Sequence, residues 1–258
     1  MTTVYPIGNP KKIFMRAMAS FLEGDFIVDA ENKKQIADLV GYFSKTFTSL
    51  NPRKGILLIG NPGSGKTILL ELFGTLVRNV DGLSFKIMTC ADASRNYSLS
   101  GEKSLAKLFQ GNYFFDDLGN EPAANHFGKR ELLSDIIFDA YNVWRKSGYT
   151  YHFTTNASPE EIKSRYGEHC WSRLNQMCNV VGLGTDANSS DRRIASLPNV
   201  LKDLEQFPKF FITDAEKRIQ EANEAIKKQY QELGNAPRQR FQSKPLGQQL
   251  KESFGMAG

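Results

Sequence analysis

The sequence is organised around the stretch Gly60-Asn61-Pro62-Gly63-Ser64-Gly65-Lys66-Thr67. A short apolar run at 56–59 precedes it and predicts a buried strand, and apolar residues at helical spacing follow it from Leu69 to Val80. Glycines let backbone N–H groups point at an anion, and a helix start adds partial positive charge. A strand, a glycine-rich turn and a helix in this order predict a Walker A phosphate-binding loop, rather than the glycine-rich turn of an ordinary α/β protein.

The side chains of this loop and of a second motif suggest a division of labour on a nucleoside triphosphate. Lys66 is expected to reach the β- and γ-phosphates, and the Thr67 hydroxyl to hold Mg²⁺. An apolar run at 113–115 ends in Asp116 and Asp117. A strand that delivers acids at its carboxyl end, about 50 residues after a Walker A motif, is typical of Walker B. Asp116 is then expected to help hold Mg²⁺, and Asp117 to polarise the attacking water.

The composition limits the class of protein. The 258 residues are enough for one large domain, or for a domain with appendages, and the hydrophobic fraction of 40% is enough for a core. No apolar run approaches the roughly 18 residues of a membrane span, and the first residues lack the pattern of a secretory signal. Cys90, Cys170 and Cys178 have no paired metal spacing, which favours buried or incidental thiols in a reducing cytosol. We therefore expect a cytoplasmic protein without a membrane partner.

The net charge of +5 is unevenly distributed along the chain. Residues 1–50 hold 6 basic and 5 acidic side chains, residues 51–233 hold 23 and 22, and residues 234–258 hold 4 and 1. The basic excess is therefore clearest in the last 25 residues. Net charge alone is only weak support for nucleic-acid binding.

Apolar periodicity predicts the remaining elements. We expect helices over 10–22, 36–47 (with Ile36, Leu39, Val40, Phe43 and Phe47 on one face), 131–145 and 215–233, and strands over 83–88, 149–155 and 179–183. Strands that alternate with helices predict a parallel sheet covered on both faces. The helix over 10–22 packs on the chain's own core by default, with a partner as the alternative. For the helix over 215–233 both remain open, and residues 234–258 are expected to be mobile.

Four stretches, at 60–67, 113–119, 154–156 and 166–174, resemble the AAA+ ATPases of the DnaC helicase-loader and IstB type. The resemblance covers roughly residues 30–195, and Asp116-Asp117-Leu118-Gly119-Asn120-Glu121-Pro122 is especially like the loader branch. It implies a three-layer P-loop α/β fold with a parallel five-stranded sheet, and we expect this AAA+ ATPase domain over 30–212. Flanking N-terminal helices begin in a helical extension (1–29). A C-terminal amphipathic helix with a mobile basic tail (213–258) lies outside the family pattern.

The resemblance assigns further roles, position by position. Asn156 matches sensor 1, which contacts the γ-phosphate and the attacking water. Arg173 matches the arginine finger, which reaches the nucleotide of a neighbouring subunit. Arg192 or Arg193 falls where a sensor 2 arginine is expected. Each arginine is alternatively a surface residue. His169 departs from the pattern, because many relatives have a second arginine there.

The function implied is that of an ATPase with ATP and Mg²⁺ at subunit interfaces, which self-associates, holds single-stranded DNA and delivers a replicative helicase. The single-stranded DNA is expected to contact Arg95, Lys103 or Lys107 in the central channel of the assembly. Alternatively, these three residues belong to an ordinary solvent-exposed face. The basic tail is the other candidate for DNA contact. Only about 30 residues are available for the separate N-terminal module of DnaC-type loaders. Alternatives are a transposition helper of the IstB kind, which engages duplex DNA and a transposase, and a P-loop small-molecule kinase.

Overall fold

The computed structural model describes residues 4–6, 8–22, 32–78, 80–184 and 210–235. It separates into two compact units, Met1–Asp214 and Ala215–Gly258. Arg192, Arg193 and residues 236–258 lie outside the described residues, so their predicted roles remain predictions. Among the helices described, none is long and apolar enough to cross a membrane.

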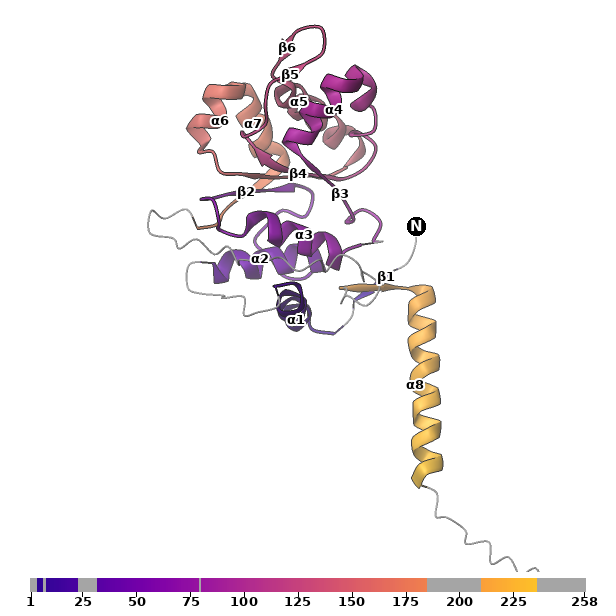
Figure 1. Cartoon of the computed structure of the whole chain (residues 1–258). Coiled ribbons are helices and arrows are strands. Elements are labelled where there is room, and N and C mark those ends of the chain that lie inside the picture. The colour runs from indigo at the N-terminus through magenta and orange to yellow at the C-terminus, as the bar shows by residue number, and fades with distance from the viewer. Residues whose placement is uncertain (1–3, 7, 23–31, 79, 185–209, 236–258) are drawn as a thin grey trace, which may run out of the picture. The chain divides into compact units, whose positions relative to one another are not determined.

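The larger unit is built on a five-stranded sheet in which all neighbouring strands are parallel (Figure 1). The strand order is β3-β4-β7-β2-β8. These strands are β2 (Gly55–Ile59), β3 (Lys86–Thr89), β4 (Tyr113–Leu118), β7 (Tyr151–Thr155) and β8 (Cys178–Gly182). The chain crosses from strand to strand through helices, as parallel pairing requires. The expected parallel five-stranded α/β fold is therefore confirmed.

Helices cover both faces of this sheet (Figure 1). One layer contains α1 (Pro10–Leu22), α2 (Lys33–Ser44) and α3 (Lys66–Leu76). The other contains α4 (Cys90–Ser100), a short 3₁₀ helix (Gly101–Ser104), α5 (Leu132–Ser147), α6 (Pro159–Tyr166) and α7 (Glu168–Met177). The period-two geometry of a strand sends neighbouring side chains to opposite layers. Phe114 of β4 accordingly packs in the first layer, and Phe115 packs in the second.

Aromatic stacking attaches the N-terminal helix to the sheet domain. Phe73 of α3 stacks on Phe14 of α1, with ring centroids 5.3 Å apart, and on Phe43 of α2, at 4.5 Å. All three rings are buried. Ring pairs of this kind add roughly 0.5–1.5 kcal/mol beyond the area they bury. Helix α1 thus packs on the chain's own core, in agreement with the default interpretation of its apolar stripe.

Local turns shift two of the predicted boundaries. Helix α2 ends at Ser44 because Lys45 adopts a left-handed conformation (φ 54°), so Phe47 leaves the apolar face and is 98% exposed. The strand expected over 83–88 begins only at Lys86, since a turn precedes it in which the amides of Leu83 and Ser84 donate to the Val80 carbonyl. In both places a local turn overrides the apolar pattern.

Two short strand pairs and a long helix complete the described residues. Strand β1 (Val4–Pro6) pairs antiparallel with β9 (Phe211–Thr213), and β5 (Ala124–Asn125) pairs with β6 (Lys129–Arg130) in a short hairpin. The second unit contains helix α8 (Asp214–Asn235), which confirms the helix expected from residue 215 onward.

Candidate functional site

The glycine-rich loop joins β2 to α3 and has the backbone geometry of a phosphate cradle. Gly60 lies so close to the chain after β8 that an added Cβ would be 1.8 Å from the Leu183 carbonyl oxygen. Gly63 and Gly65 have φ values of 81° and 88°, a region that side chains disfavour. Helix α3 then begins at Lys66. Its N-terminal N–H groups and partial positive charge therefore point into the loop.

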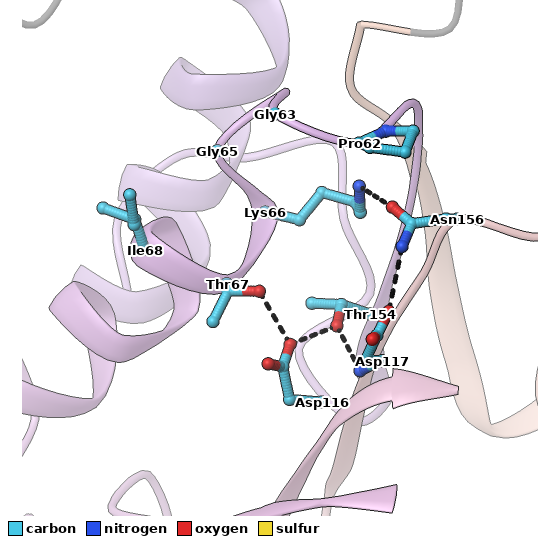
Figure 2. A pocket seen from close by; sticks show the side chains of 10 residues that line it. All are labelled: Pro62, Gly63, Gly65, Lys66, Thr67, Ile68, Asp116, Asp117, Thr154 and Asn156. Carbon is cyan, nitrogen blue, oxygen red and sulfur yellow. Dashed lines mark hydrogen bonds between the residues drawn. The ribbon is translucent and has the colours of Figure 1, made fainter. Parts of the chain in front are cut away.

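The Lys66 side chain is folded into this loop and is only 6% exposed. Its ammonium donates to the carbonyl oxygens of Gly60 and Asn61, each at 2.9 Å, and to the Ser64 hydroxyl at 3.2 Å. A fourth hydrogen bond, of 2.8 Å, joins it to the side-chain oxygen of Asn156 at the end of β7 (Figure 2). The tertiary structure therefore brings the Walker A lysine and the expected sensor 1 residue into contact.

The two acids predicted from the second motif lie beside the loop. The Thr67 hydroxyl donates to Asp116 Oδ1 at 2.8 Å, so both predicted Mg²⁺-holding groups share one corner of the pocket (Figure 2). Thr154 of β7 donates its hydroxyl to the same carboxylate at 2.5 Å and accepts from the Asp117 amide at 2.9 Å. Sequence reasoning did not single out Thr154 as a site residue. The sequence feature that could have identified it is its position on a buried strand, two residues before Asn156.

A backbone irregularity separates the two neighbouring acids. The register between β4 and β7 shifts between Phe115 and Leu118, and Asp117 has a φ of 65°. Aspartate tolerates this left-handed conformation better than most residues. Because of this irregularity the two side chains have different partners. Asp116 accepts from the Thr67 hydroxyl, while Asp117 accepts a hydrogen bond of 2.9 Å from the Asn156 amide group. Asp116 is therefore positioned beside the predicted metal-holding hydroxyl, and Asp117 beside the predicted sensor 1 residue.

These side chains line a pocket of about 250 Å³ (Figure 2): Pro62, Gly63, Gly65, Lys66, Thr67, Ile68, Asp116, Asp117, Thr154 and Asn156. That volume is below the roughly 300–1,000 Å³ of sites for whole ligands, and suits a phosphate chain with its metal. The donors fit Mg²⁺, which takes one or two protein oxygens and completes its shell with phosphates and water. Nearby, burial and the Asp116 charge raise the pKa of Glu71.

An ion pair with a buried carboxylate and a partly exposed arginine stabilises the loop that follows Asp117. The Glu121 carboxylate, 2% exposed, forms a 2.9 Å salt bridge with Arg165 of α6 and accepts from the Gly119 amide at 3.0 Å and from the Tyr166 hydroxyl. Arg165 also donates to the carbonyl oxygens of Gly119 and Glu121. This ion pair was not expected from the sequence, since the two residues lie far apart along the chain and neither motif requires it.

Arg173, the expected arginine finger, is on α7 and does not line the pocket of its own chain. Its guanidinium lies 3.8 Å from the ring centroid of Phe138 on α5 and 5.4 Å from that of Tyr141. It also donates to the His169 carbonyl at 3.1 Å. The stacking leaves the side chain partly exposed and holds it on a rigid helix. Its role toward a neighbouring subunit remains a prediction.

The fold and the loop geometry together define the class of fold. It is an AAA+-like α/β fold, with a parallel sheet in the order β3-β4-β7-β2-β8, a glycine-rich loop directly after β2, and Asp116 and Asp117 in the second half of β4. No protein-family model matches the sequence, and no curated protein matches it.

Solved structures match the fold at low sequence identity. A putative primosome component from Streptococcus pyogenes serotype M3 matches with a TM-score of 0.50 and 13% identity, and the match covers 68% of this chain and 98% of the primosome component. The DnaC helicase loader matches with a TM-score of 0.49 and 19% identity, and the match covers 65% of this chain and 98% of the loader chain. AMPPCP-bound DnaA from Aquifex aeolicus matches with a TM-score of 0.46 and 17% identity, and the match covers 65% of this chain and 51% of the DnaA chain. At these identities the comparison concerns the fold alone, and the structure with a TM-score of 0.50 shares the α/β fold of this chain.

Proposed function

We propose that this protein is an AAA+ ATPase that binds ATP with Mg²⁺ between self-associating subunits, holds single-stranded DNA and acts as a loader of a replicative helicase. The observation that carries the ATPase part is the continuous hydrogen-bonded chain from Lys66 through Asn156 to Asp117, with Thr67 and Asp116 beside it. The residues proposed for phosphate binding, metal holding and water activation all line one pocket, which supports the proposal.

The proposed hydrolysis assigns each group a task. The loop amides and Lys66 bind the β- and γ-phosphates, while Thr67 and Asp116 hold Mg²⁺, which when bound neutralises phosphate charge. Asp117 orients a water molecule whose oxygen attacks the γ-phosphorus as the bond to the β-phosphate oxygen breaks, giving ADP and phosphate. The water proton passes to Asp117 or to solvent. Asn156 fixes the Asp117 carboxylate and contacts the γ-phosphate.

The ATPase assignment is tested with two variants that separate binding from hydrolysis. Lys66→Ala removes the phosphate-binding charge and is expected to weaken ATP binding. Asp117→Asn keeps the side-chain shape, so it is expected to bind ATP normally and to stop hydrolysis. Binding is measured with a fluorescent ATP analogue, and turnover by phosphate release. Hydrolysis by Asp117→Asn at the wild-type rate would show that another group activates the water.

The loader assignment rests on the fold and on the resemblance of the motifs, and it is tested with DNA and helicase. We expect tighter binding to single-stranded than to duplex DNA, and stronger binding with a non-hydrolysable ATP analogue than without nucleotide. Equal affinity with and without nucleotide would contradict DNA binding in an ATP-dependent assembly. A marked preference for duplex DNA would instead favour a transposition helper. Capture of the replicative helicase from the protein's own cells is the direct test of the partner.

A further inference from the structure

The hairpin β5–β6 carries a phenylalanine that contributes nothing to the core. Phe127 lies between the two strands of the hairpin, has a φ of 59° and is 101% exposed. Its one ring neighbour among the described residues is His126, with centroids 4.6 Å apart. Large aromatic side chains normally bury 150–250 Å². A ring presented fully to water is therefore free to contact a ligand outside the chain, although exposure alone does not identify one.

The hairpin itself is firmly held against α4. The Asn125 amide donates to the Ser98 hydroxyl at 2.9 Å. Arg130 donates to the Tyr97 hydroxyl at 2.6 Å and to the Glu102 carboxylate at 2.7 Å. These bonds hold both strands of the hairpin to the segment at 97–102. Phe127 is thus exposed on a hairpin that hydrogen bonds hold in place. Binding through this ring therefore costs little conformational entropy of the backbone.

Among the described residues, three unpaired lysines remain on this hairpin and on the segment that follows α4. Residues 90–110 and 121–135 contain five basic side chains (Arg95, Lys103, Lys107, Lys129, Arg130) and five acidic ones (Asp92, Glu102, Glu121, Glu131, Asp135). The acids are all paired: Asp92 with Arg95 at 2.9 Å, Glu102 and Asp135 with Arg130 at 2.7 and 2.5 Å, and Glu121 and Glu131 with Arg165 at 2.9 and 3.1 Å. The three lysines are exposed and form no ion pair in the part of the chain that the structure describes. A polyanion is the ligand that this charge favours.

We propose that the ring of Phe127 stacks on an unpaired base of single-stranded nucleic acid and that Lys129, two residues away, contacts the adjoining phosphate. An aromatic face beside cations satisfies both halves of a nucleotide, and stacking on base faces is possible only where bases are not enclosed in a duplex. This inference rests on the proposed single-stranded DNA binding and adds contacts that the motifs did not indicate. Arg95 is paired with Asp92, so the hairpin is the better candidate for contact with the DNA.

The chain offers a matched control. Phe47 is also almost fully exposed, at 98%, but it follows α2 in the opposite helical layer. Binding of a labelled oligothymidylate is measured by fluorescence anisotropy for the full-length protein with a non-hydrolysable ATP analogue. Phe127→Ala is expected to raise Kd about fivefold or more, the loss of one stacked base. Phe127→Trp is expected to retain wild-type affinity, and Phe47→Ala to leave it unchanged. Lys129→Ala is expected to reduce the salt slope by about 0.7.

The outcomes separate this inference from the proposed function. Wild-type binding that Phe127→Ala leaves unchanged would overturn the stacking contact while DNA binding stands. A loss in Phe127→Ala that Phe127→Trp does not restore would also overturn it, because stacking needs only an aromatic face. If wild-type protein binds no single-stranded DNA, both proposals fail. Reduced helicase capture by Phe127→Ala with unchanged DNA affinity would assign the hairpin to a protein partner instead. ATP hydrolysis without DNA is the folding control and is expected to stay at the wild-type rate.

Discussion

The ammonium of Lys66 and the side-chain oxygen of Asn156 lie 2.8 Å apart, although the two residues are 90 positions apart in the sequence. The same Asn156 side chain donates its amide hydrogen to Asp117 at 2.9 Å. One amide therefore links the phosphate-binding lysine to the acid proposed to activate water. A γ-phosphate that draws Lys66 toward itself would also act on Asn156, and through it on the position of Asp117.

This arrangement predicts that Asn156→Ala impairs hydrolysis much more than binding. Loss of one preorganised polar group at a reacting centre costs on the order of 10²-fold in turnover. Turnover and nucleotide affinity are measured on the same preparation. The control is Asn120→Ala, because Asn120 also donates to Asp117 Oδ1, at 2.7 Å, but lines no part of the phosphate pocket. Equal loss in both variants would mean that the contact with Lys66 is unimportant.

The arginine finger proposal predicts that Arg173→Ala binds ATP normally and loses most turnover. An arginine supplied by a neighbouring subunit is worth on the order of 10³–10⁵ in rate. Mixing Arg173→Ala with Lys66→Ala is expected to recover some activity, because a mixed interface can combine an intact phosphate cradle with an intact finger. Absence of recovery at every ratio, with mixed assembly confirmed, would count against a shared site.

The ion pair of Glu121 and Arg165 predicts a stability effect. Arg165→Ala leaves the buried Glu121 carboxylate without its ion-pair partner, which is expected to cost about 3 kcal/mol of unfolding free energy, at the lower end of the range for buried pairs because Arg165 is 29% exposed. Adding Glu121→Gln is expected to recover part of that loss, since a neutral amide is cheaper to bury. Urea unfolding provides the measurement. The exposed pair of Arg95 and Asp92 is the control, and Arg95→Ala is expected to cost no more than about 1 kcal/mol.

Burial of His152 predicts a pH-dependent stability. The imidazole is 1% exposed, accepts a hydrogen bond from the Ile56 amide through Nδ1, and packs beside Phe43 and Phe85. Burial lowers its pKa from 6.5 to about 3. Between pH 6.5 and pH 3 His152 binds a proton in the unfolded chain but not in the folded chain. The contribution of neutral, buried His152 to the free energy of unfolding is therefore complete above about pH 6.5 and falls as the pH decreases toward 3.

From pH 7 to pH 5 the loss attributable to His152 is expected to be about 2 kcal/mol of unfolding free energy. Urea titrations at both pH values measure it. His152→Asn removes the ionisable group and is expected to flatten the pH dependence, whereas His169→Asn changes an exposed histidine and serves as the control. If His152→Asn kept the full wild-type slope, other groups would account for the acid sensitivity.

Local sequence patterns determined much of the fold. The apolar run at 56–59, the glycine-rich loop and the helix after it identify the phosphate cradle, because each depends on residues within about one turn or strand of its neighbours. The acids at 116–117 were placed after a buried strand for the same reason. Alternation of strands with helices then indicated a parallel sheet, since parallel neighbours need crossover connections.

The tertiary structure alone decided which distant side chains meet. The contacts of Thr154 with both acids depend on β4 and β7 being neighbours and on a register shift between Phe115 and Leu118. No local pattern encodes that register. The ends of elements were likewise decided beyond periodicity, as the left-handed Lys45 that releases Phe47 from α2 shows. The sequence did not identify Phe127 as a binding candidate, because it does not show whether a phenylalanine in a short loop is buried. Only the folded chain shows that this ring is exposed.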